Sequence, residues 1–387
     1  MRKSKLTILT TLLSCSALLA AGCGGEGGSD GSGEGGTLTI AMIQPLTGTS
    51  GYYGGRIQQG AQLAVDEVNA AGGVLGRKLA LTVEDGQSDK TQTVNLFRKL
   101  ASDRNVPVIV GPTDSSSYLA AAPLAESLKV TWFSAGSGSP WPDGLPNDYT
   151  YRNTVPFEVM VSSHLRNVLP KLGATEVSAI YSPDNAGVAG PQEIGSRTVK
   201  ELGITEAAVV EAKSGTTDFG PQITRLQANS PKVVIVNLTT ADASLFMRQA
   251  RGRGLQAQFV AGHNGLLDLK VMELSQGAAE GLIVPSHFSA DQSDPEVKKF
   301  LDAWAAKNGK LDDYLVTYGY DVVFIIKQAI EAANSVSDRT AIAENIGKIK
   351  DLCLASGCYN YEGPGDRVGA DVFPIVMTAN GFEKWAP

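Results

Sequence analysis

The chain has 387 residues, of which 43% are hydrophobic and 19% are charged, and its formal net charge is −7. A chain of this length is too long to fold around one simple hydrophobic core, and it suits two lobes. The composition is typical of a globular protein. The acidic balance argues against a nucleic-acid-binding protein, which needs a basic face to meet phosphate groups.

The N-terminal segment has the pattern of a secretory signal peptide over residues 1–22. A positive region with Arg2, Lys3 and Lys5 precedes an apolar stretch that is too short, and too rich in serine and threonine, for a membrane span. The stretch ends in LAAGC, which is similar to a bacterial lipobox, so we expect cleavage before Cys23 and lipid attachment to its thiol. Residues 23–36 would then comprise the lipidated cysteine and a flexible, glycine-rich tether.

Strand-like and helix-like patterns alternate from Thr37 onward. We expect strands over 38–43, 79–83, 106–110, 130–133, 177–181, 208–210, 233–236 and 258–260, and helices over 57–68, 91–101, 118–128, 157–172, 194–202, 223–228, 243–250, 295–307, 321–333 and 340–349. Near-continuous apolar strands separated by helices predict parallel sheets covered on both faces. Because the alternation of strands and helices restarts after SGSPWPDGLPND, we expect an α/β fold class with two doubly wound lobes.

The C-terminal region adds two local features. Cys353 and Cys358 are the two cysteines that remain after the predicted signal and anchor, and in an exported protein this favours a small disulfide loop. A metal site is less favoured because the three histidines are scattered along the chain. Asn380-Gly381 predicts a hairpin turn near the end.

Several segments resemble, in order, the substrate-binding proteins of branched-chain amino acid ABC transporters. They are IAMIQPLTGTSGYYGG with the following DEVNAAGGVLGRKL, then GPTDSSSYLAAAP, FMRQARGRGL and YGYDVVFIIKQAIEAA. The resemblance spans nearly all of residues 37–387 and implies a type 1 periplasmic-binding fold, with three crossover strands and a ligand cleft between two lobes. By position we expect lobe 1 to hold 37–153 plus 286–356 and lobe 2 to hold 154–285 plus 357–387. The crossings are expected near 152–154, 284–285 and 357–361.

The resemblance implies ligand contacts on the first lobe after the third and fourth strands. Ser115, with Ser116 beside it, would receive a ligand carboxylate, although a simple helix cap is the alternative. After the fourth strand, backbone and hydroxyl contacts would come from Gly136, Ser137, Gly138 and Ser139. The alternative for this second group is a flexible turn.

Two aromatic positions also match the family on the first lobe. Tyr53 would form a wall of the pocket, and a surface loop tyrosine is the alternative. Tyr318 would approach the cleft from the last major helix, unless it packs in the core. Trp141 has two open interpretations, as an aromatic lid over the cleft or as the cover of a loop.

The second lobe departs from the family pattern. Asn185, Thr239 and the pair His263-Asn264 stand where relatives carry an aromatic residue, a tyrosine and a glutamate, respectively. A buried ammonium group needs a compensating partner, so a leucine-like zwitterion is in question. Asp184 and Asp242 are possible substitutes, and caps or solvated acids are the alternative.

We therefore expect a binding protein without cofactor or metal. It would be lipid-anchored on the outer side of the cell membrane, capture an amino acid or related polar solute, and present it to the permease subunits of an ABC importer. A ligand-sensing lipoprotein, or a binder of short amides, urea or aromatic acids, is the alternative. An enzyme is disfavoured because no motif places a nucleophile beside a base and an orienting acid.

Overall fold

The structure, a computed structural model, describes residues 36–288 and 294–386. The predicted signal peptide, Cys23 and nearly all of the tether lie outside the described residues. The described chain belongs to one compact unit, Gly35–Pro387. Within the described ranges, no helix combines the length and the apolar character that a membrane span requires.

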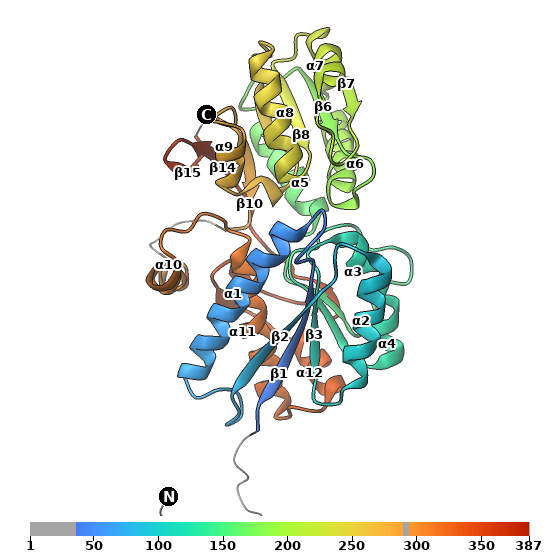
Figure 1. Cartoon of the computed structure of the whole chain (residues 1–387), viewed down its shortest axis with the longest axis vertical. Helices are drawn as coiled ribbons and strands as arrows, with labels where there is room; N and C mark the ends of the chain where they lie inside the picture. Colours follow the sequence, from blue (N-terminus) through green and yellow to red (C-terminus); the bar gives the residue numbers. More distant parts are fainter. Residues whose placement is uncertain (1–35, 289–293, 387) are drawn as a thin grey trace, which may run out of the picture. The chain divides into compact units, whose positions relative to one another are not determined.

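The first sheet contains six strands in the order β13-β5-β4-β3-β1-β2, all paired in parallel (Figure 1). Its strands are β1 Leu38–Gln44, β2 Leu79–Asp85, β3 Val108–Gly111, β4 Thr131–Ser134, β5 Thr150–Arg152 and β13 Gly365–Asp366. The central strands β3 and β4 are buried at every position because helices cover both faces. One face carries α1 Gly51–Ala70, α11 Val316–Ala333 and α12 Arg339–Ile346, and the other carries α2 Lys90–Ser102, α3 Ser115–Ala121 and α4 Pro123–Leu128.

The second sheet contains seven strands in the order β15-β14-β10-β9-β8-β6-β7. Five adjacent strands pair in parallel, from β7 at one edge to the interior strand β10. They are β6 Glu176–Tyr181, β7 Thr205–Glu211, β8 Val233–Asn237, β9 Gln258–Ala261 and β10 Ile283–Ser286. An antiparallel hairpin of β14 Phe373–Thr378 and β15 Gly381–Lys384 completes the edge. Helices α5 Phe157–Val168 and α6 Ala186–Glu201 cover one face, and α7 Gly220–Gln227, α8 Thr240–Gly252, η1 Asn264–Leu266 and α9 Lys270–Leu274 lie on the other.

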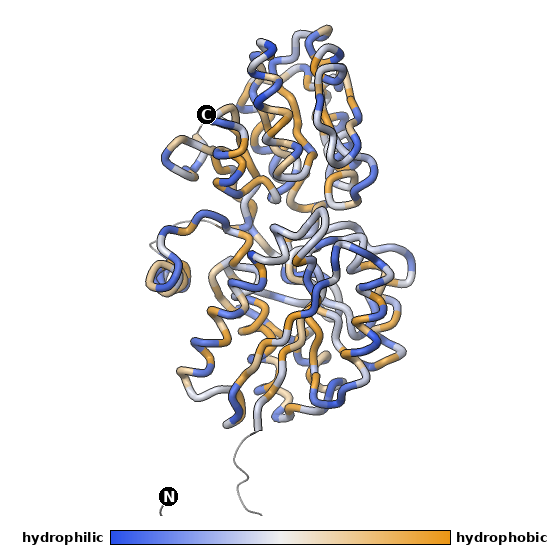
Figure 2. Tube along the Cα trace, viewed as in Figure 1, coloured by the Kyte–Doolittle hydropathy of each residue, from blue (hydrophilic) through white to orange (hydrophobic). Residues whose placement is uncertain are grey.

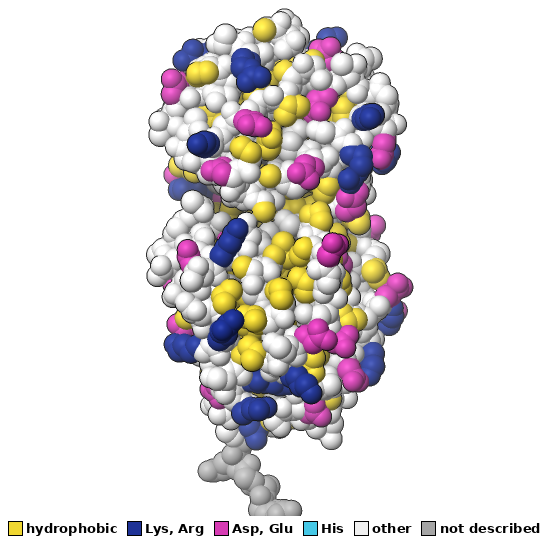
Figure 3. Space-filling view, turned by 90° about the vertical axis from the view of Figure 1, so that its right-hand side faces the viewer, with side chains coloured by type: hydrophobic (Ala, Val, Ile, Leu, Met, Phe, Trp, Pro, Cys, Tyr) yellow, Lys and Arg dark blue, Asp and Glu magenta, His cyan; other side chains and the backbone are white. Residues whose placement is uncertain are grey.

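Each sheet with its helices forms one α/β lobe, which confirms the predicted fold class. Hydrophobic residues follow the strands and the inner sides of the helices in both lobes (Figure 2). The helix α10 Pro295–Asn308 packs on the first lobe, where the Phe300 ring lies 5.0 Å from that of Tyr320. On the face drawn in Figure 3, acidic and basic side chains are interspersed over both lobes.

The chain crosses between the lobes three times. The crossings follow β5, β10 and β13, and the third one occupies residues 367–372. The expectation of a crossing near 357–361, with all of 357–387 in lobe 2, is wrong. Residues Gly357–Tyr359 form β12, which pairs with β11 Leu352–Leu354 in a hairpin that the Cys353–Cys358 disulfide closes. The chain then returns to the first sheet, where Asp366 pairs with Arg152 of β5 and accepts a 2.6 Å hydrogen bond from its Nε.

The helix expected over 118–128 is two helices, α3 and α4, that meet at Pro123. Proline lacks the amide hydrogen that a continuous helix needs at this position, and its ring clashes with the preceding turn. The first of these helices also begins earlier than expected, at Ser115. This earlier start places the polar residues after β3 directly at the edge where the two lobes meet.

Candidate functional site

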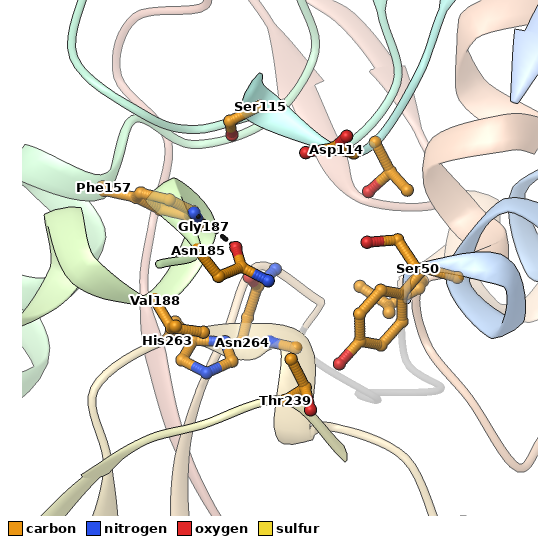
Figure 4. Close-up of a pocket in the computed structure, with 15 residues that line it drawn as sticks. Ser50, Asp114, Ser115, Phe157, Asn185, Gly187, Val188, Thr239, His263 and Asn264 are labelled. Atoms are coloured by element: carbon orange, nitrogen blue, oxygen red, sulfur yellow. Dashed lines mark hydrogen bonds between the residues drawn. The ribbon is translucent and has the colours of Figure 1, made fainter. Parts of the chain in front are cut away.

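A pocket of about 70 Å³ is lined by residues of both lobes. Every strand that supplies a lining loop does so from its carboxyl end, where open α/β sheets bind ligands. The lining residues are Ser50, Tyr53, Thr113, Asp114, Ser115, Gly136, Phe157, Asn185, Gly187, Val188, Thr239, His263, Asn264, Gly265 and Leu315. In Figure 4, Asp114 and Ser115 of the first lobe lie opposite Asn185, His263 and Thr239 of the second.

Ser115 reaches the pocket from the first residue of α3. Its side chain is buried, and its Oγ accepts a 2.9 Å hydrogen bond from the Ser137 hydroxyl. The helix cap is Asp114, whose carboxylate accepts bonds from the Ser116 backbone N–H at 3.0 Å and from the Ser117 hydroxyl at 2.5 Å. The cap interpretation for the serines is therefore wrong, since the preceding aspartate fills that role. Ser115 lines the pocket, whereas Ser116 does not.

The loop after β4 is shaped by close packing. Gly136 has a φ of +120°, and a Cβ at this position would lie 2.4 Å from the Thr113 hydroxyl oxygen. A Cβ on Gly138 would lie 2.6 Å from the Phe157 ring, so both positions require glycine. Of the four residues predicted in this loop, only Gly136 lines the pocket.

The other three residues of the loop support the site from behind. Ser137 is fully buried, and its backbone N–H donates to the Ser134 hydroxyl at 3.0 Å. Gly138 accepts a 2.8 Å hydrogen bond from the backbone N–H of Phe157, which positions that ring at the pocket. The Ser139 hydroxyl donates to the Ala186 carbonyl at 3.4 Å, which links the first lobe to the start of α6.

Tyr53 joins the two lobes at the edge of the pocket. Its hydroxyl oxygen accepts a 2.9 Å hydrogen bond from the backbone N–H of Thr240, the first residue of α8. The Thr240 hydroxyl donates to the Gly265 carbonyl at 3.2 Å, so the Tyr53 hydroxyl donates to Thr240 Oγ1 across 3.0 Å. The ring lines the pocket, and the hydroxyl fastens α1 to α8.

Asn185 and Thr239 face the pocket from the starts of two second-lobe helices. Asn185 caps α6, and its Oδ1 accepts a 2.9 Å hydrogen bond from the Gly187 backbone N–H. Its amide nitrogen makes no hydrogen bond to another described residue and projects into the space between the lobes (Figure 4). Thr239 caps α8 and donates its hydroxyl proton to Asp242 at 3.2 Å.

His263 is held neutral by its own lobe. The Gly265 backbone N–H donates to Nδ1 at 3.0 Å, so Nε2 carries the proton and donates to the Leu238 carbonyl at 3.0 Å. Burial lowers the pKa of His263 to about 4. Both ring nitrogens are therefore occupied, and His263 presents its ring rather than a free nitrogen to the pocket.

Asn264 connects the pocket to a second link between the lobes. Its amide nitrogen donates to the Tyr318 hydroxyl at 2.9 Å and to His287 Nδ1 at 3.2 Å. The His287 ring stacks on that of Tyr318 at a centroid distance of 4.0 Å. Tyr318 does not line the pocket, so its ring packs in the core and only its hydroxyl reaches the site through Asn264.

Asp184 and Asp242, the possible ammonium partners, do not line the pocket. Asp184 is exposed and accepts bonds from the backbone N–H and the hydroxyl of Ser214. The Asp242 carboxylate accepts from the Gly215 backbone N–H at 3.1 Å as well as from Thr239, and burial raises its pKa. Trp141 is also absent from the lining, and its Nε1 donates to Asp366 at 3.0 Å beside the third crossing.

Sequence reasoning missed eight of the lining residues, namely Ser50, Thr113, Asp114, Phe157, Gly187, Val188, Gly265 and Leu315. Asp114 could have been found, because it directly precedes the serines and is a preferred helix cap. Phe157 had no such signal, since its place depends on the packing of β4 and α5. Across the part of the chain that the structure describes, no three metal-binding side chains gather into a site.

Comparisons with known proteins agree with this architecture. The chain is 29% identical over 333 residues to the Leu/Ile/Val-binding protein BraC3 of Rhizobium johnstonii, which covers 85% of this chain and 88% of that protein. It is 26% identical over 336 residues to the leucine-, isoleucine-, valine-, threonine-, and alanine-binding protein of Pseudomonas aeruginosa, with coverages of 87% and 88%.

Solved structures show the same fold. The leucine binding protein LivK of Thermotoga maritima matches with a TM-score of 0.83 and 27% identity, over 90% of this chain and 98% of that one. A solute binding protein of an ABC transporter from R. palustris, in complex with benzoate, matches with a TM-score of 0.80 over 90% and 96%, and at 15% identity it shows the fold alone. The periplasmic binding protein family matches residues 37–370. With two α/β lobes, three crossings and a pocket at the carboxyl ends of the strands, the chain belongs to the periplasmic binding protein family and has its type 1 fold.

Proposed function

We propose that this protein captures a small amino acid or amino-acid-like solute between its two lobes and delivers it to the permease of an ABC importer. The observation that carries the proposal is the pocket itself, which both lobes line with hydroxyl and amide groups at the carboxyl ends of their strands. The names of relatives that bind leucine, isoleucine and valine support an amino acid as the ligand class.

The contacts between the lobes suggest how capture works. Tyr53 bonds to Thr240, Asn264 bonds to Tyr318, and each of these pairs joins one lobe to the other beside the pocket. A ligand that bridges the lobes would add its own contacts to these bonds and shift the population toward the closed form. The permease would then recognise the closed form.

The side chains at the pocket favour binding over catalysis. A serine nucleophile needs a base within hydrogen-bond reach, but the Ser115 hydroxyl meets another serine, Ser137. The lining histidine, His263, has both ring nitrogens bonded to backbone groups. The described residues of the pocket thus provide recognition groups without an activated nucleophile.

The lipid anchor is part of the same proposal. A lipid on Cys23 and the glycine-rich segment after it would hold the lobes close to a membrane-bound permease. The Cys23→Ser variant should therefore leave the membrane fraction of cells that express it. Wild type and variant in the same fraction would contradict the anchor but would leave solute capture intact.

Thermal-shift screening of the mature protein tests the capture of a solute. The panel should contain the twenty amino acids, short amides, urea and benzoate. A ligand at one hundred times its Kd stabilises the folded state by about 2.7 kcal/mol, which gives a readily measured rise in Tm. We expect at least one amino acid to raise Tm and Ser115→Ala to weaken its binding. If only solutes other than amino acids raise Tm, the proposed ligand class is contradicted.

A further inference from the structure

The charge inside the pocket is unbalanced. Asp114 is the one lining residue with a carboxylate, and none of the described lining residues is a lysine or an arginine. His263 adds no positive charge, because backbone groups occupy both of its nitrogens. None of the ion pairs formed by the described residues includes Asp114. A half-buried carboxylate therefore faces a pocket that offers it no cation of its own.

The carboxylate still has hydrogen-bonding capacity for a ligand. Oδ1 accepts one bond from the Ser116 backbone N–H, and Oδ2 accepts one from the Ser117 hydroxyl. A carboxylate has about four lone-pair sites, so about two remain on Asp114. The two bonds hold the group rigidly at the start of α3, beside the Ser115 hydroxyl (Figure 4). A fixed, partly dehydrated carboxylate is well suited to pair with a cationic donor.

The opposite side of the pocket offers a complementary donor. The Asn185 amide nitrogen, which projects into the space between the lobes in Figure 4, has no described partner. It can donate to a carboxylate or a carbonyl oxygen. The two acids of the second lobe, Asp184 and Asp242, are bonded to other groups outside the pocket.

We propose that Asp114 is the residue that selects the ligand, by pairing with a positively charged amino group. The ligand would be a small zwitterion or amine that places this group against the first lobe and its oxygen atoms against Asn185. This orientation is the reverse of the one expected from the serine row, in which Ser115 receives the carboxylate. An anion without an amino group would meet the Asp114 carboxylate, and the described lining has no lysine or arginine side chain to offset the repulsion between the two negative charges. The inference rests on the proposed function, since it concerns the ligand of the same pocket.

Matched pairs of ligands test the assignment by isothermal titration calorimetry on the mature protein. Leucine with 4-methylpentanoate and alanine with propionate differ only by the amino group, and 3-methylbutylamine is leucine without its carboxylate. In Asp114→Asn the amino acid that binds the wild type should bind about 10- to 100-fold more weakly, the range expected for a hydrogen bond to a charged group. The corresponding acid without the amino group should bind equally well or more tightly, because the repulsion is gone.

Two control variants make each outcome decisive. Asparagine is also a preferred helix cap, so α3 should keep its start, and Asp114→Ser provides a second uncharged cap if the first variant folds poorly. Asp184→Asn removes the same charge outside the pocket and should leave every affinity unchanged. Equal weakening of both members of a ligand pair, or unchanged binding of the amino acid by Asp114→Asn, overturns the assignment while solute capture stands. A wild-type protein that binds no member of the panel overturns the proposed function and the assignment together.

Discussion

Tyr53→Phe removes a single oxygen atom from the link between the lobes. The hydroxyl accepts a bond from the Thr240 backbone N–H at 2.9 Å and donates one to Thr240 Oγ1 at 3.0 Å. The Thr240 hydroxyl loses the proton donated by Tyr53 but keeps its own bond to the Gly265 carbonyl, so the backbone N–H is the one donor left without a partner. Because the phenyl ring remains, the wall of the pocket is preserved.

The expected loss follows from the burial of the orphaned group. Thr240 is 7% exposed, so its amide has little access to water when the lobes are in contact. A buried donor without a partner costs about 1–3 kcal/mol, which corresponds to a roughly 5- to 150-fold rise in Kd if the bond forms only when the lobes close. A water molecule that enters the gap and accepts the bond from this N–H would bring the loss of binding free energy to the lower end of this range.

Calorimetric titration with an amino acid that binds the wild type measures this loss directly. Tyr181→Phe is the matched control, because the Tyr181 hydroxyl donates to Glu211 at 2.8 Å within the second lobe and away from the pocket. We expect the control to bind with wild-type affinity. If Tyr53→Phe binds as tightly as the wild type, or lowers only the free energy of unfolding, the link does not contribute to capture and the reasoning is refuted.

Three further predictions concern stability. Gly136→Ala should lower the free energy of unfolding in urea by about 2–4 kcal/mol through backbone strain and the Thr113 clash. Gly144→Ala, at a φ of +80° with nothing within 4 Å, should cost only about 1–2 kcal/mol, and equal losses would contradict the role of the clash. Reduction of the Cys353–Cys358 disulfide should cost about 2 kcal/mol for so short a loop, measured as a drop in Tm with dithiothreitol that is absent in the double serine variant. Burial raises the pKa of Asp321 to about 6, so the folded protein holds this proton more tightly than the unfolded chain, whose aspartates titrate near ~4. The free energy of unfolding should therefore fall from about pH 4 to about pH 6 relative to that of Asp321→Asn, and parallel pH profiles of the two proteins would contradict this.

Much of the fold was predictable from local patterns. Apolar strands such as those predicted over 106–110 and 233–236 alternate with amphipathic helices, and this alternation already implies parallel sheets covered on both faces. The strand β13 was not predictable, because two residues carry no periodicity and pair with β5 only after the chain has returned from the disulfide hairpin. Helix α3 begins at Ser115 rather than at Tyr118 because Asp114 supplies the cap, which is a local signal that the prediction did not use.

Local sequence patterns were enough to predict the family order of the motifs, the two-lobed α/β architecture and the positions of the polar residues at the strand ends. They could not predict which of these residues meet, because lining a pocket depends on the packing of two lobes whose contacts join residues far apart in the chain. Packing brings the Ser137 hydroxyl within hydrogen-bond distance of the Ser115 hydroxyl. It also buries the Tyr318 ring in the core, where the Tyr318 hydroxyl accepts a hydrogen bond from the Asn264 amide. Packing also leaves Asp114, which local pattern identifies only as a cap, as the one carboxylate among the described residues that line the pocket.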